Sequence, residues 1–255
     1  YMNIAIITGA SSGMGKEFAK KLDEENFDEL WLVALSEEKL KQTASELKTK
    51  SKIFAYDLTL QENLQKITDA LKEQKPNVKW LVNASGFGKF GRYDAIPLLE
   101  SMSMIDLNCK ALVYITETAL PYMNDGARIV QFGSIAGFQP VPYINVYSAT
   151  KAFVVSYSRA LNMELKKQKI SVTCICPYWT KTQFFKRAVD LENQVVKKYV
   201  VMYDAQKVID KAFADAKKRK ELSTYGFKAV SQRRLVKFMP HKLVMKIWMH
   251  QQKLK

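Results

Sequence analysis

Short apolar runs alternate with longer amphipathic segments along most of the chain. The runs lack polar–apolar alternation, which predicts strands that are covered on both faces of a sheet. We expect strands at residues 3–8, 30–35, 53–56, 78–82, 127–132, 170–175 and 221–225.

Between these runs, apolar residues recur at the three- and four-residue spacing of helices. The expected helices pass through Phe18, Ala19 and Leu22, begin at Ser36, and span 61–73, 98–122, 143–167 and 183–218. Strands that alternate with helices of this length indicate βαβ units and a parallel sheet. The predicted fold is a doubly wound α/β domain over residues 1–226, followed by a helical tail at 227–255.

The composition agrees with one globular domain. The 255 residues are 47% hydrophobic and 25% charged, close to the averages of such domains. The longest apolar runs fall far short of the roughly 18 residues of a membrane span, and no signal peptide is expected. Cys109, Cys174 and Cys176 suit neither a disulfide framework nor a metal site. We therefore expect a cytoplasmic protein that holds no metal.

The positive charge is concentrated in the tail. From Lys217 onward, 12 Lys/Arg stand against Glu221 alone, in a chain of net charge +15. The body is therefore near neutral, and its charge does not predict nucleic-acid binding. The tail is expected to hold two short helices separated by Pro240. In the second, spacings such as Val244/Trp248 predict a basic amphipathic helix. Such a helix can lie on an anionic membrane or pack against its own body or a partner subunit. The broad apolar band favours packing, and both readings remain open.

A glycine-rich turn joins the first strand to the first helix. Its residues are Gly9, Ser11, Ser12, Gly13, Met14 and Gly15. Backbone N–H groups in such a turn can approach a pyrophosphate, and the helix N-terminus adds partial positive charge. A tight turn that binds nothing is the alternative, but its position at the start of a βαβ chain favours a dinucleotide site.

The end of the second strand bears on the choice between NAD and NADP. Leu35 and Ser36 stand there, where an acid would hold the ribose hydroxyls of NAD. The missing acid favours NADP. Asp57 and Leu58 follow the third strand, where they can contact an adenine or simply begin the next helix.

Tyr147 and Lys151 are four residues apart, so they share one face of the predicted helix. A second such pair, Tyr203 and Lys207, occurs in the chain, so the spacing alone says little. Ser134, however, ends the fifth strand at the sheet edge where ligands bind. A lysine ammonium can favour the phenolate of Tyr147 and make it a general acid/base. The amide of Asn108 can orient a water or support the lysine.

Together these motifs resemble the short-chain dehydrogenase/reductase superfamily over residues 3–185. Thr8–Gly15 matches its TGxxxGxG turn, and Asn83, Ala84, Ser85 and Gly86 resemble its strand-four motif. Asn108, Ser134, Tyr147 and Lys151 match its catalytic tetrad in order and spacing. The segments 83–91 and 134–140 most resemble a bacterial ketoreductase branch with hydroxysteroid-dehydrogenase-like members.

The resemblance implies a Rossmann fold and hydride transfer between NAD(P) and a carbonyl carbon. It makes Tyr147 the proton donor and acceptor, and Lys151 a ligand of the nicotinamide ribose. It also implies that Asn108 anchors a proton-relay water. The segment with Pro177, Thr180 and Thr182 is implied to contact the carboxamide of the nicotinamide. The family's glycine after that proline is Tyr178 here. Relatives are commonly homodimers or homotetramers through helices such as those near residues 98–122 and 145–167.

Aromatic residues gather on the loops that are expected at the catalytic edge. They are Phe87, Phe90, Phe138, Tyr143, Tyr178, Phe184 and Phe185. Such a set suits a pocket for a bulky steroid-like or lipid-like ketone or alcohol, although any one ring can instead be core. Residues 183–201 are expected to form a mobile cover. A nucleotide sensor on the same fold, or a membrane-bound protein that acts through its tail, are the alternatives to an enzyme.

Overall fold

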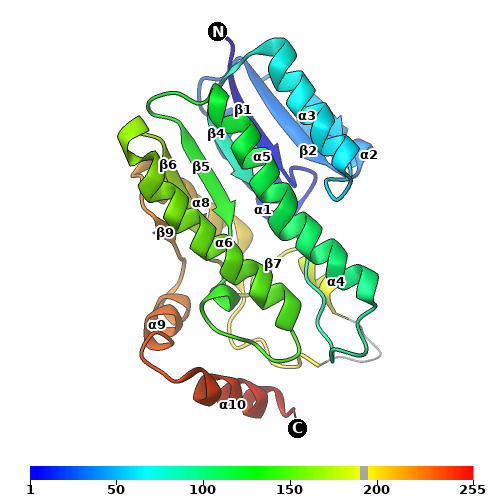
Figure 1. The fold of residues 1–255 in the computed structure, drawn as a ribbon, viewed down its shortest axis with the longest axis vertical. Helices are drawn as coiled ribbons and strands as arrows, with labels where there is room; N and C mark the ends of the chain where they lie inside the picture. The colour runs from blue at the N-terminus through cyan, green and yellow to red at the C-terminus, as the bar shows by residue number, and fades with distance from the viewer. Residues whose placement is uncertain (190–194, 255) are drawn as a thin grey trace.

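The computed structural model of the chain describes residues 1–189 and 195–254. Its centre is a parallel sheet of order β3-β2-β1-β4-β5-β6-β9 (Figure 1). The strands are β1 Asn3–Thr8, β2 Glu29–Ala34, β3 Ser51–Ala55, β4 Asn77–Asn83, β5 Arg128–Phe132, β6 Ser171–Ile175 and β9 Leu222–Ser223. The strand order reverses between β1 and β4, which places a crevice for ligands at their carboxyl ends. The predicted doubly wound sheet is confirmed.

Helices cover both faces of the sheet. One face packs against α1 Gly13–Asp23, α2 Glu37–Ser45 and α8 Ala205–Lys217, and the other against α3 Gln61–Gln74, α5 Leu112–Ala119 and α6 Asn145–Glu164. Along β1, Ile4 and Ile6 enter one hydrophobic core, whereas Ala5 and Ile7 enter the other. Because both faces are buried, the strand is apolar from Ile4 to Ile7.

The helix expected at residues 98–122 has the predicted extent but is not uniformly α. It consists of α4 Leu98–Ile105, a π-helical turn Asp106–Ala111, α5, and a 3₁₀ turn Leu120–Tyr122. A π turn widens the helix and is frequent at functional sites. The spacing of apolar residues does not reveal it, because both flanking segments keep a helical pattern.

The continuous helix expected at residues 183–218 was a wrong prediction. The structure has α7 Phe184–Ala188, non-helical chain at 195–202, and then α8. The backbone N–H groups of Lys197 and Lys198 donate to Oε1 of Gln252, both at 2.9 Å, rather than to helical carbonyls. Part of the cover predicted at 183–201 falls on residues 190–194, outside the described residues.

The tail forms the two helices expected on either side of Pro240, α9 Phe227–Leu235 and α10 His241–Gln252. The indole nitrogen of Trp248 donates to the carbonyl oxygen of Pro142 at 3.0 Å, which fastens α10 to the body. Figure 1 shows α10 at the end of the molecule toward which the strands point. Among the described helices, none has the length and apolar character needed to cross a bilayer.

Candidate active site

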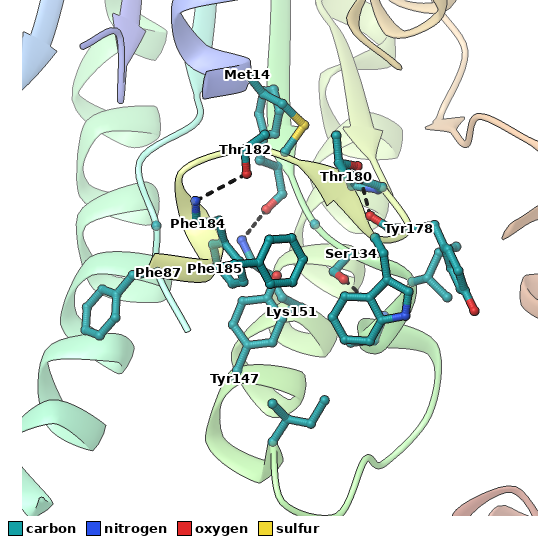
Figure 2. A pocket seen from close by; sticks show the side chains of 18 of the residues that line it. Met14, Phe87, Ser134, Tyr147, Lys151, Tyr178, Thr180, Thr182, Phe184 and Phe185 are labelled. Atoms are coloured by element: carbon teal, nitrogen blue, oxygen red, sulfur yellow. Dashed lines mark hydrogen bonds between the residues drawn. The ribbon is translucent and has the colours of Figure 1, made fainter. Parts of the chain in front are cut away.

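A cavity of about 750 Å³ lies at the carboxyl edge of the sheet. At one end it is bordered by the glycine turn that follows β1, and at the other by α9 and α10. Ser134, Tyr147 and Lys151 line the cavity between these ends. Figure 2 shows these three residues close together, with Phe184 and Phe185 beside them.

The glycine turn is packed too closely for larger residues. A Cβ on Gly15 would lie 2.3 Å from the carbonyl oxygen of Gly9. Gly9 itself has φ +70°, and a Cβ there would lie 2.8 Å from the backbone of Ala84. Glycine at both positions lets the chain fold back on itself and begin α1 at the cavity edge.

The residues present fit a dinucleotide at this turn. Ser12 caps α1 with its backbone only, and the first turn of the helix carries no acidic side chain. The N-terminal N–H groups and their partial positive charge therefore remain available to an anion. Ser11, Ser12, Gly13 and Met14 all line the cavity.

Tyr147 and Lys151 project from one face of α6 into the cavity, as their spacing predicts. The ammonium Nζ of Lys151 donates to the carbonyl oxygen of Phe132 at 2.6 Å and lies 5.7 Å from the ring centre of Tyr147. Ser134 follows β5. Its Oγ accepts from the backbone N–H of Ala136 at 3.1 Å, and its hydroxyl lies near enough to the phenol of Tyr147 to lower that group's pKa. Two hydroxyl groups are thus aimed at the same part of the cavity.

The side chain of Asn108 holds the chain that follows β4. Its Oδ1 accepts from the backbone N–H of Phe87 at 3.1 Å, and its Nδ2 donates to the carbonyl oxygen of Phe87 at 2.9 Å. The same Nδ2 also lies 3.1 Å from Oγ1 of Thr150 on α6. Asn108 is buried in the π turn and joins three elements behind the cavity. Its amide therefore holds the backbone of Phe87 in place and does not itself line the cavity.

Burial changes both ionisable groups at the centre. It raises the pKa of Tyr147 to about 12, against which the hydrogen bond from Ser134 acts. Burial lowers the pKa of Lys151 to about 8. The sequence predicts a lowered pKa for Tyr147, and the structure gives the opposite direction because burial disfavours the phenolate. At neutral pH Tyr147 therefore holds its proton and is ready to donate it.

Replacement of Lys151 by Met tests the buried charge through stability. Between the folded pKa of about 8 and the unfolded value, the folded state binds fewer protons. The stability of the folded state therefore rises with pH between these two pKa values. Below the folded pKa, Lys151 is charged in both states, and the full cost of burying its ammonium remains. We expect the wild type to gain on the order of 2 kcal/mol of unfolding free energy relative to Lys151→Met between about pH 7 and about pH 9.5. Urea unfolding at both pH values measures this gain, and equal pH dependence would contradict it.

Most of the predicted cofactor residues lie on the cavity wall. They are Gly9, Ser11, Ser12, Gly13, Met14, Gly15, Leu35, Asp57, Leu58, Ala84, Gly86, Tyr147, Lys151, Pro177, Thr180 and Thr182. Two are placed elsewhere. The hydroxyl of Ser36 accepts from the N–H of Lys39 at the start of α2, and the amide of Asn83 donates to Thr116 in the core at 2.9 Å.

The predicted aromatic pocket is divided between cavity and core. Phe87, Tyr178, Phe184 and Phe185 line the cavity. Phe90 is buried beneath it, with its ring against those of Tyr147 and Phe184. Phe138 and Tyr143 lie outside the cavity wall. Phe138 packs in the cluster around Val154, and Tyr143 has φ +66° in the loop before α6.

The sequence does not predict several of the residues that line the cavity. Trp179 follows Tyr178, and Arg187 stands on α7 with its guanidinium 3.5 Å from the ring centre of Phe87. The tail adds Leu235, Val236, Met239, Val244, Ile247, Trp248, Gln251 and Gln252. The amphipathic spacing of α10 was visible in the sequence, but nothing in it showed which part of the body the helix would meet.

Comparisons with known proteins agree with this geometry. Residues 3–193 match the family model described as short chain dehydrogenase. The chain is 34% identical over 188 residues to sulfoacetaldehyde reductase 2 of Chromohalobacter salexigens, which covers 71% of this chain and 74% of that protein. It is 32% identical over 192 residues to very-long-chain 3-oxoacyl-CoA reductase of Macaca fascicularis, covering 71% and 61%.

The fold is shared with solved structures. A short-chain dehydrogenase from Sphingobium yanoikuyae in complex with NADPH superposes with a TM-score of 0.78, at 24% identity, over 94% of this chain and 97% of that chain. The chain thus belongs to the short-chain dehydrogenase family. Within it, the chain is an NAD(P)-dependent oxidoreductase.

Proposed function

We propose that this oxidoreductase interconverts a bulky apolar ketone and its secondary alcohol. The observation that carries the proposal is the apolar wall beside Tyr147 and Ser134. Trp179, Phe184 and Trp248 belong to this wall, and burying apolar substrate surface against aromatic rings is the main source of affinity in such a pocket. Two relatives named as reductases support the carbonyl chemistry.

The cofactor is proposed to extend from the glycine turn toward Tyr147. The turn and the N-terminus of α1 would hold its pyrophosphate, and Asp57 and Leu58 would border its adenosine. Ala84, Gly86 and the segment from Pro177 to Thr182 would border the nicotinamide. When bound, this group supplies the hydride that reduces the carbonyl carbon.

The chain's own residues handle the proton. In reduction, Tyr147 gives its hydroxyl proton to the carbonyl oxygen and then regains one from solvent; in oxidation it accepts the proton of the alcohol. Tyr147 is protonated at neutral pH, as proton donation in reduction requires. Ser134 holds the substrate oxygen beside the phenol. Lys151 keeps a positive charge near the phenol below about pH 8, and Asn108 fixes the backbone of Phe87.

A size series of ketones tests the substrate class. We expect kcat/KM with a fixed nicotinamide cofactor to rise from acetone through branched aliphatic ketones to steroid and long-chain ketones. The physical reason is the greater apolar area that leaves water in the aromatic pocket. Trp179→Ala should lower kcat/KM for the bulky ketones more than for acetone. A preference for small ketones in the wild type would overturn the proposed substrate class.

We also propose a preference for NADP over NAD. Leu35 borders the cavity directly after β2, where it is 70% exposed. No carboxylate stands at this position to repel a 2′-phosphate.

The substitution Leu35→Asp tests this preference. It should weaken NADPH binding relative to NADH by about tenfold, because an aspartate repels the phosphate and accepts from the ribose hydroxyls of NADH. Because Leu35 is exposed, the variant should fold like the wild type, and thermal unfolding checks this. Titration of NADPH and NADH by their fluorescence gives the ratio of dissociation constants; an unchanged ratio would remove Leu35 from cofactor selection.

The chain is further proposed to form a homodimer or homotetramer. Large apolar side chains on α4 and α6 are exposed in the single chain, namely Leu98, Leu99, Met102, Ile105, Phe153 and Met163. An exposed apolar group of this kind is typical of a surface that another subunit covers.

A further inference from the structure

Large apolar side chains remain exposed on the tail even though α10 packs against the body. Phe227 and Phe238 are 87% and 86% exposed, and Leu235, Leu243 and Ile247 are also exposed. We call these five residues the C-terminal apolar patch. Helical spacing places Phe227 and Leu235 on one face of α9, and Leu243 and Ile247 on one face of α10.

Packing on the body accounts for a different part of α10. Val244 is buried, and Trp248 donates to the carbonyl oxygen of Pro142. Gln252 is also buried, and its amide is bonded to the backbone of Lys197 and Lys198. These contacts leave Leu243 and Ile247 47% and 41% exposed. Packing on the protein's own body therefore accounts for the apolar residues on one side of α10 only.

The two helices that carry the patch hold basic residues and no acidic ones. Residues 227–254 contain seven Lys/Arg and no Asp or Glu. Lys228, Arg234, Lys237, Lys242, Lys246 and Lys253 are exposed, and no ion pair links them to any acid in the described ranges 1–189 and 195–254. Apolar side chains amid exposed cations are complementary to a bilayer with anionic headgroups.

The patch also borders the mouth of the active-site cavity. Leu235 and Ile247 are exposed, and both line that cavity. The cavity therefore opens beside the surface that carries the patch. The match to the family model ends at residue 193, so α9 and α10 lie beyond the residues that this model describes.

We propose that α9 and α10 dock on an anionic lipid bilayer, with the C-terminal apolar patch in the interface and the cavity mouth facing the lipid. An apolar ketone dissolved in the bilayer would then reach Tyr147 without crossing water, a consequence that rests on the proposed function. The docking itself does not depend on turnover.

Co-sedimentation of the full chain with vesicles tests the docking. We expect the protein to pellet with vesicles of phosphatidylcholine and phosphatidylglycerol, and much less with phosphatidylcholine alone. The double variant Phe227→Ser/Phe238→Ser and the double variant Lys242→Glu/Lys246→Glu should each weaken this binding by about tenfold or more. None of these four residues lines the cavity, so turnover of a water-soluble ketone should stay at the wild-type level.

A matched control separates local charge from net charge. Lys166→Glu/Lys167→Glu makes the same change in net charge on exposed residues after α6, and it should leave vesicle binding unchanged. Equal weakening by this control would show non-specific attraction and overturn the proposal. So would the absence of pelleting with anionic vesicles, or a native mass that falls when Phe227 and Phe238 are replaced, since a second copy would then cover the patch. Binding without turnover would contradict the proposed function alone.

Discussion

The variant Tyr147→Phe is expected to lose turnover by roughly a hundredfold to ten-thousandfold and to bind the cofactor like the wild type. The substitution removes one hydroxyl and leaves the ring, which packs against Phe90 and Phe184. The fold and the cavity wall therefore stay, whereas the proton donor is lost. Steady-state rates with a saturating ketone, together with a fluorescence titration of NADPH, measure the two effects separately.

The second Tyr/Lys pair of the chain supplies the control. Tyr203 stands on β8, Tyr203–Asp204, and packs against Tyr178 and Tyr225 outside the cavity wall. Tyr203→Phe should therefore retain turnover. If Tyr147→Phe kept near-normal rates, another group would have to donate the proton, and the assignment of Tyr147 would be wrong.

The variant Gly15→Ala is expected to weaken NADPH binding by at least about tenfold. Its Cβ would lie 2.3 Å from the carbonyl oxygen of Gly9, a backbone atom that cannot move without distorting the turn. The turn would open, and its N–H groups would lose their common direction toward the pyrophosphate. Titration of NADPH into the folded variant, with its melting temperature as a check, measures the effect.

Gly13→Ala provides the comparison for this prediction. Gly13 has φ +54°, but a Cβ there would meet only Thr182, at 3.7 Å. Its cost is thus the strain of a left-handed residue, about 1 kcal/mol, without a backbone clash. A smaller loss of affinity than in Gly15→Ala is expected. Equal, wild-type affinity in both variants would show that the turn does not bind the cofactor.

The sequence predicted those parts of the site that depend on local spacing. The glycine turn requires a strand, a tight turn and a helix in direct succession. Neighbouring residues along the chain predict all three. Tyr147 and Lys151 stand one helical turn apart, and Ser134 directly follows the end of a strand. Local periodicity is enough to place each of these groups at the cavity.

Features that depend on long-range packing could not be read in the same way. The pair of hydrogen bonds between Asn108 and Phe87 joins the π turn to the chain after β4, two segments that are distant in the sequence. Asn83 follows the family motif, but its side chain turns into the core toward Thr116. Whether the pKa of Tyr147 is raised or lowered depends on how completely the surrounding chain excludes water.

The tail shows the same limit. Its amphipathic pattern predicts a helix that buries one face but does not identify the surface that it covers. The structure places Trp248 against the loop of Pro142 and brings Ile247 to the cavity mouth. The apolar residues of α10 are therefore divided between two sides of the helix. One side packs on the protein body, and the other remains exposed.

One measurement tests the central claim most directly: titration of the wild type with NADPH and NADH, followed by addition of a bulky ketone and observation of the nicotinamide absorbance. The account predicts that cofactor binds, with NADPH the tighter of the two, and that the ketone causes its oxidation with equimolar formation of the alcohol. Binding of neither cofactor, or binding without oxidation by any ketone of the size series, would contradict it.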